Sequence, residues 1–346
     1  SRWVRVELGY TQELAMLCML SRAARVSVRP GRRYFAFAQP DKEFYLDFTN
    51  VGGLRHRCIQ WGSPSAEGHF VLCLHAASLC CGVWGPMAGR LAPGSLVVAC
   101  DLRGHGKTDA PGQDGYSWHL FGEDFTRLVT AVSEQFSRRL TACITHSFAG
   151  DTALIGLAER PAKAPLVGRM ILLDPVLADA EGATVGAERL AKGTRRLGEK
   201  ESDGYDSESA VGDSLDRILR AALARDSVHP EAKAAFAAFG SYNDNGRWRL
   251  CCRRENEAEV YANRVALAEY LAKKKVDCEV QLVLASKRRA KPEDQESALQ
   301  RDQQQAEGVV SRCLPGSAVH AADGVGHFLL LEDPSFVADI VQKLLP

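Results

Sequence analysis

The sequence has no long hydrophobic run and no excess of charge of either sign. None of its apolar stretches approaches the roughly 18 residues that a transmembrane helix needs. Its 43 lysines and arginines balance 43 aspartates and glutamates, so the formal net charge is zero. Binding to nucleic acid or to a membrane surface usually relies on a basic excess. We therefore expect neither an integral membrane segment nor a nucleic-acid partner.

The sequence also has no C-x-x-C pair, although it contains 11 cysteines. Zinc sites built from cysteine usually need that spacing, so we expect no metal site. Two pairs are adjacent in the chain, Cys80-Cys81 and Cys251-Cys252, and adjacent cysteines rarely chelate or form a bridge. Others lie in strand-like apolar runs, where a thiol behaves as a small hydrophobic side chain: Cys73, Cys100, Cys143 and Cys278. This usage predicts free thiols in a reducing compartment.

Acidic residues are missing from Ala15 to Gln39, a stretch that contains five arginines. A short apolar patch overlaps its start, from Leu14 to Leu20. A basic segment without acids is typical of an organelle transit peptide, and a plain amphipathic helix is the alternative. We therefore interpret residues 1–40 as an N-terminal extension. It could either target the chain to an organelle or form an ordinary amphipathic helix. The expected location is intracellular, in the cytoplasm or in an organelle such as a mitochondrion or plastid.

What the sequence does contain is an alternation of strand-like and helix-like segments. Continuous apolar runs typical of buried parallel strands occur at 70–74, 96–100, 140–144, 170–173 and 280–285. Helical periodicity separates them, most clearly over 118–136. Alternating patterns at 43–49 and 55–61 predict a hairpin before these runs, and 318–321 predicts a last short strand. The alternation predicts an α/β fold with a mostly parallel central sheet flanked by helices.

The rhythm of strands and helices stops between 176 and 275. This stretch is helix-prone and partly polar, and it contains no apolar run of strand length. We interpret 176–275 as a helical cap inserted after the sixth strand and packed over the edge of the sheet. The core then consists of 41–175 together with 276–346.

Ser147 stands at the apex of a predicted tight turn between the 140–144 strand and a helix at 148–158. Small residues flank it two positions away, Thr145 before and Ala149 after, where the chain passes close to itself. Such a serine is the candidate nucleophile, and an ordinary turn residue is the alternative. A serine hydroxyl reacts well only when a base takes its proton and a third group orients that base. In an open parallel sheet, such groups meet at the C-terminal ends of the strands.

Two side chains at strand ends could complete this arrangement. His327 follows the last predicted strand, and the glycines at 324 and 326 permit a tight loop that aims its ring. Asp174 ends the 170–173 strand directly after the helix that follows the serine. The other position for an acid, after the 280–285 strand, has no carboxylate before Glu293. We therefore prefer Asp174 as the acid and His327 as the base.

An acyl-transfer site also needs two N–H donors for the oxyanion. The backbone N–H of Phe148 follows the nucleophile directly, and that of Ala77 lies in the loop after the 70–74 strand. A phosphate-binding loop at Gly106-Lys107-Thr108 is excluded, because Asp101 stands where that motif requires glycine.

Four motifs in this order resemble those of the α/β-hydrolase superfamily. They are Val71-Leu-Cys-Leu-His-Ala-Ala77, Asp101-Leu-Arg-Gly-His-Gly-Lys-Thr108, His146-Ser-Phe-Ala-Gly150 and Gly324-Val-Gly-His-Phe328 with Glu332-Asp-Pro334 after it. Within that superfamily, 245–251 and 257–261 resemble a segment of cap-bearing esterases of the pimeloyl-ACP methyl ester carboxylesterase-like group. The resemblance implies a serine esterase of the carboxylesterase or lipase type that acts on a small-molecule ester without a cofactor. It implies Ser147 as nucleophile, His327 as base and Asp174 as acid.

Three departures from the family pattern leave a second function open. Thr145 is β-branched at a crowded position, Ala76 replaces a glycine, and the usual acid after the 280–285 strand is missing. A catalytically impaired hydrolase fold that acts as a binding or scaffold protein is therefore the alternative. A haloalkane dehalogenase or an epoxide hydrolase would need aspartate at the position of Ser147.

Overall fold

The computed structural model describes most of the chain after the N-terminal stretch. The described residues are 37–65, 67–112, 114–160, 166–274, 276–286, 295–314 and 316–346. Nearly all of the predicted N-terminal extension therefore lies outside them, and its targeting role stays a prediction. Within the described ranges, no helix combines the length and the apolar character needed to cross a membrane.

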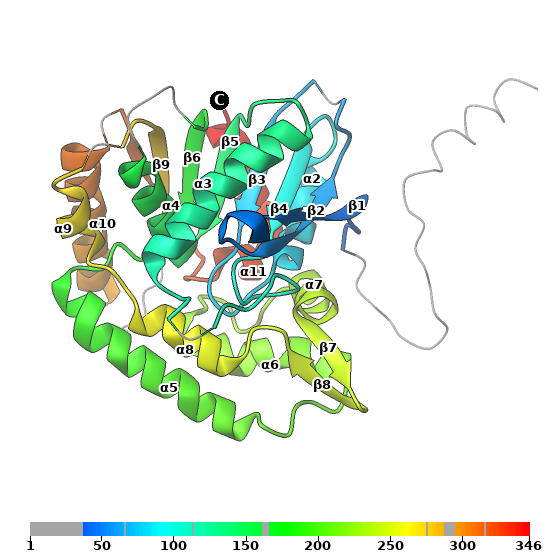
Figure 1. Ribbon diagram of the computed structural model, residues 1–346. Coiled ribbons are helices and arrows are strands. Elements are labelled where there is room, and N and C mark those ends of the chain that lie inside the picture. The colour runs from blue at the N-terminus through cyan, green and yellow to red at the C-terminus, as the bar shows by residue number, and fades with distance from the viewer. Residues whose placement is uncertain are drawn as a thin grey trace, which may run out of the picture. The chain divides into compact units, whose positions relative to one another are not determined.

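The centre of the fold is a sheet of eight strands in the order β1-β2-β4-β3-β5-β6-β9-β10 (Figure 1). The strands are β1 (Lys42–Asp47), β2 (Arg55–Trp61), β3 (Phe70–Leu74), β4 (Leu96–Cys100), β5 (Ala142–His146), β6 (Arg169–Leu173), β9 (Glu279–Ala285) and β10 (Ala318–Ala322). β1 pairs antiparallel with β2, and β2 pairs antiparallel with β4. All other neighbours are parallel. The predicted mostly parallel sheet is confirmed.

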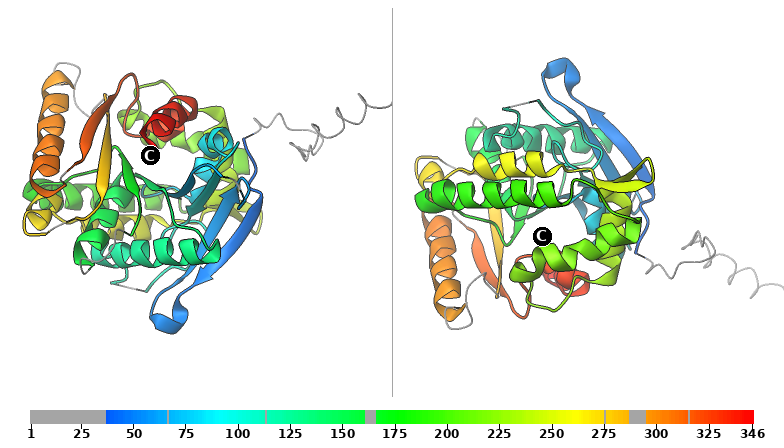
Figure 2. Two further views of the ribbon diagram at one scale, coloured as in Figure 1. Left: turned by 90° about the horizontal axis from the view of Figure 1, so that it is seen from above. Right: turned by 90° about the horizontal axis from the view of Figure 1, so that it is seen from below.

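Two hydrophobic clusters, one on each face, explain why the central strands are apolar throughout. Along β3, Phe70, Leu72 and Leu74 belong to one cluster, whereas Val71 and Cys73 belong to the other. This is the period of two that a strand imposes on its side chains. α3 (Trp118–Gln135), α4 (Phe148–Glu159) and α10 (Gln295–Cys313) contribute to the first cluster. α2 (Gly85–Leu91) and α12 (Pro334–Leu344) contribute to the second, and Figure 2 shows α3 and α12 on opposite sides of the sheet.

The chain between β6 and β9 is largely helical, as predicted. It contains η4 (Gly182–Gly186), α5 (Ala187–Lys200), α6 (Glu208–Leu219), η5 (Arg220–Ala222), α7 (Pro230–Gly240), β7 (Ser241–Asp244), β8 (Arg247–Leu250), α8 (Arg254–Ala262) and α9 (Leu267–Leu271). Figure 1 shows α5 to α8 grouped at one edge of the sheet. We call the segment from η4 to α9 the insertion.

The hairpin β7–β8 in the insertion was not predicted. Its strands carry polar residues and are only partly buried, so they lack the apolar run by which strands were sought. The sequence nevertheless marks the turn with the pair Asn245-Gly246. In the structure both residues have the positive φ that such a turn needs, 52° and 89°. An Asn-Gly pair is the strongest short-range signal of a two-residue hairpin turn.

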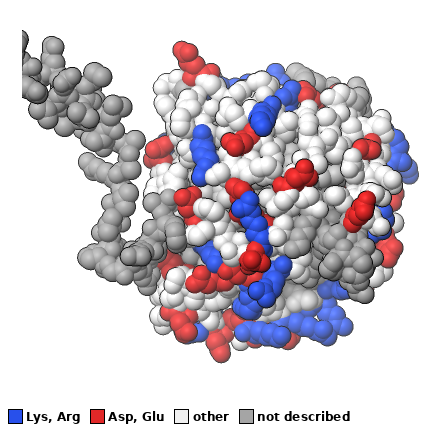
Figure 3. Space-filling view, turned by 180° about the vertical axis from the view of Figure 1, so that it is seen from behind, with Lys and Arg blue, Asp and Glu red and all other residues white. Residues whose placement is uncertain are grey.

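The exposed surface carries charges of both signs. On the face drawn in Figure 3, acidic and basic side chains lie next to one another. This mixture agrees with the formal net charge of zero.

Candidate active site

Ser147 is the single residue between β5 and α4. β5 extends to His146, two residues beyond the predicted strand, and α4 begins at Phe148. Ser147 has φ 57° and ψ −134°, a conformation that costs energy for any residue with a Cβ. Its N–H donates to the Leu173 carbonyl at 2.9 Å, and its own carbonyl accepts from the Gly150 N–H at 2.9 Å. The strand, the helix and these two hydrogen bonds hold the strained turn in place.

Thr145 occupies the crowded position two residues before Ser147, where a small residue is usual. Thr145 is fully buried, and its hydroxyl has no hydrogen-bond partner. A Cβ at Gly150 would lie 3.1 Å from the Thr145 hydroxyl oxygen, so the glycine leaves the space that the threonine occupies. The β-branched residue is therefore tolerated at the cost of an unsatisfied hydroxyl.

The structure brings Ser147, His327 and Asp174 into contact at the C-terminal edge of the sheet. The His327 Nε2 lies 3.0 Å from the Ser147 Oγ, and the His327 Nδ1 lies 2.7 Å from the Asp174 Oδ2. The other Asp174 oxygen, Oδ1, accepts from the Ala285 N–H at 2.8 Å. Since β6 and β9 are neighbours, an acid at the end of β6 reaches the histidine. The alternative acids at 293 and 294 lie outside the described residues.

The loop that carries His327 is held by backbone and side-chain hydrogen bonds. The His327 N–H donates to the Ala222 carbonyl at 2.9 Å. Glu332 is buried, and its Oε1 accepts from the Gly326 N–H at 3.0 Å. Its Oε2 accepts from the N–H groups of Ala224 and Arg225, which belong to the insertion. Glu332 therefore connects the loop that carries His327 to the insertion through hydrogen bonds. The sequence did not reveal this role.

His146 contacts the loop that carries His327 from the strand side. Its Nε2 lies 2.8 Å from the His327 carbonyl oxygen, so Nε2 carries the proton and donates. Its Nδ1 is buried without a partner. Burial, assisted by repulsion from His327, lowers the pKa of His146 to about 3. The ring is therefore neutral near pH 7, and it fixes the backbone of His327.

The predicted oxyanion donors, Ala77 and Phe148, line the same cavity as Ser147. Within the described ranges, neither backbone N–H donates to another protein group. Two free N–H donors beside a serine oxygen are the arrangement that would stabilise an oxyanion formed there. The left-handed residue of the Ala77 loop is Ser78, with φ 69°. Alanine is thus accepted at position 76 without a strained backbone.

Two buried histidines hold the Ala77 loop against the turn after β4. The His75 Nε2 accepts from the Leu102 N–H at 3.1 Å, and the His105 Nε2 accepts from the Ser78 N–H at 3.3 Å. Their Nδ1 atoms donate to backbone carbonyls. Burial lowers the pKa of each ring to about 4, which keeps both neutral. They shape this loop and lie outside the Ser147–His327–Asp174 contact.

The cavity in front of Ser147 has a volume of about 480 Å³. Pockets that bind small molecules are typically about 300–1,000 Å³, so this one suits a small substrate. Besides the predicted residues, it is lined by side chains from the insertion and α10 that the sequence did not single out, among them Leu190, Tyr261, Arg264, Arg301 and Gln305.

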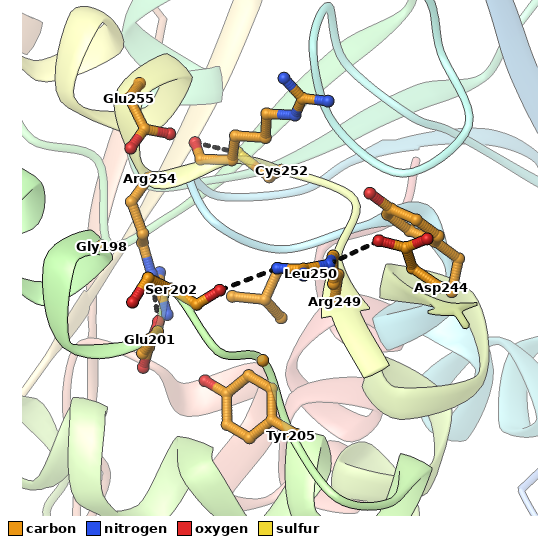
Figure 4. Close-up of a pocket in the computed structure, with 13 residues that line it drawn as sticks. Gly198, Glu201, Ser202, Tyr205, Asp244, Arg249, Leu250, Cys252, Arg254 and Glu255 are labelled. Atoms are coloured by element: carbon orange, nitrogen blue, oxygen red, sulfur yellow. Dashed lines mark hydrogen bonds and ion pairs between the residues drawn. The ribbon is translucent and has the colours of Figure 1, made fainter. Parts of the chain in front are cut away.

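A second cavity, of about 420 Å³, lies within the insertion and shares no lining residue with the first (Figure 4). Arg254 is buried beside it and is paired with Glu201 at 2.9 Å and Glu257 at 2.6 Å. Arg249 is paired with Asp244 at 2.8 Å. These ion pairs balance the charges of Arg249 and Arg254. Across the described residues, no group of three His, Cys, Asp or Glu side chains could hold a metal ion.

Comparison with known proteins gives a family and a set of similar structures. A family model described as the alpha/beta hydrolase family matches residues 71–340. No curated protein matches the chain. A thioesterase domain from the curacin biosynthetic pathway is 21% identical, with a TM-score of 0.63 over 87% of this chain and 99% of that chain. An esterase from Thermogutta terrifontis is 17% identical, with a TM-score of 0.60 over 88% and 98%.

A probable hydrolytic enzyme from Pseudomonas aeruginosa PAO1 is 20% identical, with a TM-score of 0.62 over 90% of this chain and 96% of that chain. At identities this low, the three similarities show a shared fold.

Proposed function

The chain belongs to the alpha/beta hydrolase family, and on that premise we propose that it is a serine hydrolase that cleaves a carboxylic ester through an acyl-enzyme intermediate. The observation that supports the proposal most strongly is the continuous contact from the Asp174 Oδ2 through the His327 ring to the Ser147 Oγ. A serine needs this arrangement to become a nucleophile near neutral pH.

In the first half of the reaction, the Ser147 Oγ attacks the ester carbonyl carbon while the His327 Nε2 takes its proton. Asp174 accepts from the Nδ1–H, which fixes the tautomer and stabilises the imidazolium. The N–H groups of Phe148 and Ala77 donate to the oxyanion. When the tetrahedral intermediate collapses, His327 gives the proton to the leaving alkoxide, and the acyl group remains on Ser147.

In the second half, His327 takes a proton from water, and the hydroxide attacks the acyl carbon. Collapse of this intermediate returns the proton to Ser147 and releases the carboxylic acid. The balance needs only the ester and water, so the mechanism uses no cofactor. We further propose that 176–275 acts as a cap over the core formed by 41–175 and 276–346, because Tyr261 and Arg264 from it line the cavity.

The proposal is tested by Ser147→Ala on a p-nitrophenyl ester of a short acid. We expect kcat to fall about 10⁴-fold or more, because the residual rate comes from the oxyanion donors and binding alone. Ser311→Ala, an exposed serine on α10, is the matched control and should keep the rate. Full esterase activity in Ser147→Ala would overturn the mechanism.

The choice of a carboxylic ester rests on the resemblance to cap-bearing esterases, and a C–C hydrolase would use the same triad. The scaffold alternative is weaker, because Thr145 and Ala76 both fit their sites without displacing Ser147 or the Ala77 loop. Ser147 itself speaks against dehalogenase or epoxide hydrolase chemistry, which uses an aspartate nucleophile.

A further inference from the structure

Arg264 lines the cavity in front of Ser147 and has almost no partner there. It lies in the connection between α8 and α9 and is partly buried. Its Nη1 donates to the Gly182 carbonyl at a long 3.4 Å, and its Nε is buried without any acceptor. No described aspartate or glutamate forms an ion pair with it.

The carboxylate that most attracts the Arg264 charge already accepts hydrogen bonds from other groups. Asp151, at the start of α4, attracts the Arg264 charge. However, its two oxygens accept from the N–H groups of Val176 and Leu177, each at 2.8 Å. Burial raises the pKa of Asp151 to about 6, so this carboxylate is mostly charged near pH 7, but no described ion pair joins it to Arg264. Asp151 therefore positions the 176–177 backbone and leaves the guanidinium unpaired.

An unpaired guanidinium in a partly buried site is costly, since charged groups are normally buried only with a partner. Burial lowers the pKa of Arg264, yet an arginine keeps its proton in proteins. The paired Arg254 of the other cavity shows how the same chain satisfies a buried arginine that has a structural role. The next charged residues on the lining of this cavity, the exposed Arg301 and the neighbouring Asp302, carry opposite charges, so Arg264 is the cation that the described residues leave without an ion pair.

We propose that the substrate carries an anionic group, a carboxylate or a phosphate, which Arg264 binds while the ester lies against Ser147. This inference rests on the proposed hydrolase function and names the substrate class of that site. A guanidinium binds such an anion through two parallel hydrogen bonds. A sphere of the cavity's volume is about 10 Å across, so the anion lies within about that distance of the ester carbon.

The test compares esters that differ only at the end of the acyl chain. The p-nitrophenyl monoester of glutarate ends in a carboxylate, its methyl ketone analogue is neutral, and a third ester ends in a phosphonate. We expect kcat/KM for the better anionic ester to exceed that for the neutral ester by about 10- to 100-fold. Arg264→Gln should bring this ratio close to one, and Arg264→Lys should keep part of it. The ester with the higher kcat/KM, the carboxylate or the phosphonate, identifies which anion the site prefers.

Arg195→Gln is the matched control, because Arg195 is an exposed arginine of the insertion that is paired with Glu259 at 2.8 Å. It removes the same charge and should leave the ratio unchanged. Equal hydrolysis of neutral and anionic esters by the natural chain, or an unchanged ratio in Arg264→Gln, would overturn the inference and leave the hydrolase proposal standing.

A binding measurement separates the two proposals. Glutarate itself should raise the melting temperature of the natural chain and not that of Arg264→Gln. If no ester were hydrolysed but glutarate bound through Arg264, the hydrolase proposal would fail and the anion site would stand. If neither glutarate nor a phosphonate bound, the anion site would be refuted whatever the activity.

Discussion

Acid should destabilise the fold through three buried histidines. His75, His105 and His146 have pKa values lowered to about 4, 4 and 3, against an ordinary value of 6.5. Burial is the main cause in each case. Between these values and 6.5, the unfolded chain binds protons that the folded chain does not. The free energy of unfolding must therefore fall as the pH falls.

The size of the effect follows from linkage. Lowering the pH from 7 to 5 costs about 2 kcal/mol for each histidine. Asp151 acts in the opposite direction, because its pKa is raised to about 6 in the fold and it gains a proton there. It returns about 1 kcal/mol over the same range. The net loss is about 5 kcal/mol, which is comparable to the whole stability of a weakly stable domain, about 5–15 kcal/mol.

Urea unfolding, followed by tryptophan fluorescence between pH 7 and pH 5, measures this loss. His105→Gln is the informative variant, because its amide oxygen can still accept from the Ser78 N–H but does not titrate. It should lower overall stability little and reduce the loss between pH 7 and pH 5 by about 2 kcal/mol, or about two-fifths of the total. A free energy of unfolding that stays level or rises toward pH 5, or an unchanged slope in the variant, would refute the reasoning.

Two further predictions concern the elbow. Thr145→Val removes a buried hydroxyl without a partner and should raise the free energy of unfolding, measured by urea denaturation, by about 1 kcal/mol. Thr145→Ser keeps the hydroxyl and should not raise it. A valine variant that is less stable than the natural chain would contradict this prediction. His146→Phe removes the donor to the His327 carbonyl and should lower kcat about 10-fold with KM nearly unchanged. His146→Gln keeps a donor at that place and should recover most of the rate, and equal losses in both variants would argue against a positioning role.

The three residues that meet at the C-terminal edge of the sheet could be predicted from the sequence, because the ends of parallel strands meet at that edge. Ser147, His327 and Asp174 each follow a run that could be identified as a strand, and parallel pairing brings such ends to one edge. The preference for Asp174 came from the absence of another acid, and the neighbouring positions of β6 and β9 give it a geometric reason.

The residues that the sequence did not reveal belong to segments without a strong period. Arg264 lies in a short connection between helices, and only the packing of the insertion brings it to the cavity that Ser147 also lines. Glu332 is one acid among many in the sequence, and two of its three N–H partners, those of Ala224 and Arg225, come from a distant part of the chain. The hairpin β7–β8 was missed because its strands are polar, although Asn245-Gly246 marked its turn.

The central claim is that Ser147 is a nucleophile activated by His327. Labelling the folded chain with a fluorophosphonate and mapping the adduct by peptide mass spectrometry tests it most directly. The probe should form a single adduct on Ser147. It should not react with a chain that was heat-denatured beforehand, and it should react much more slowly with His327→Ala. A folded chain that stays unlabelled, or one labelled on another serine, would contradict it.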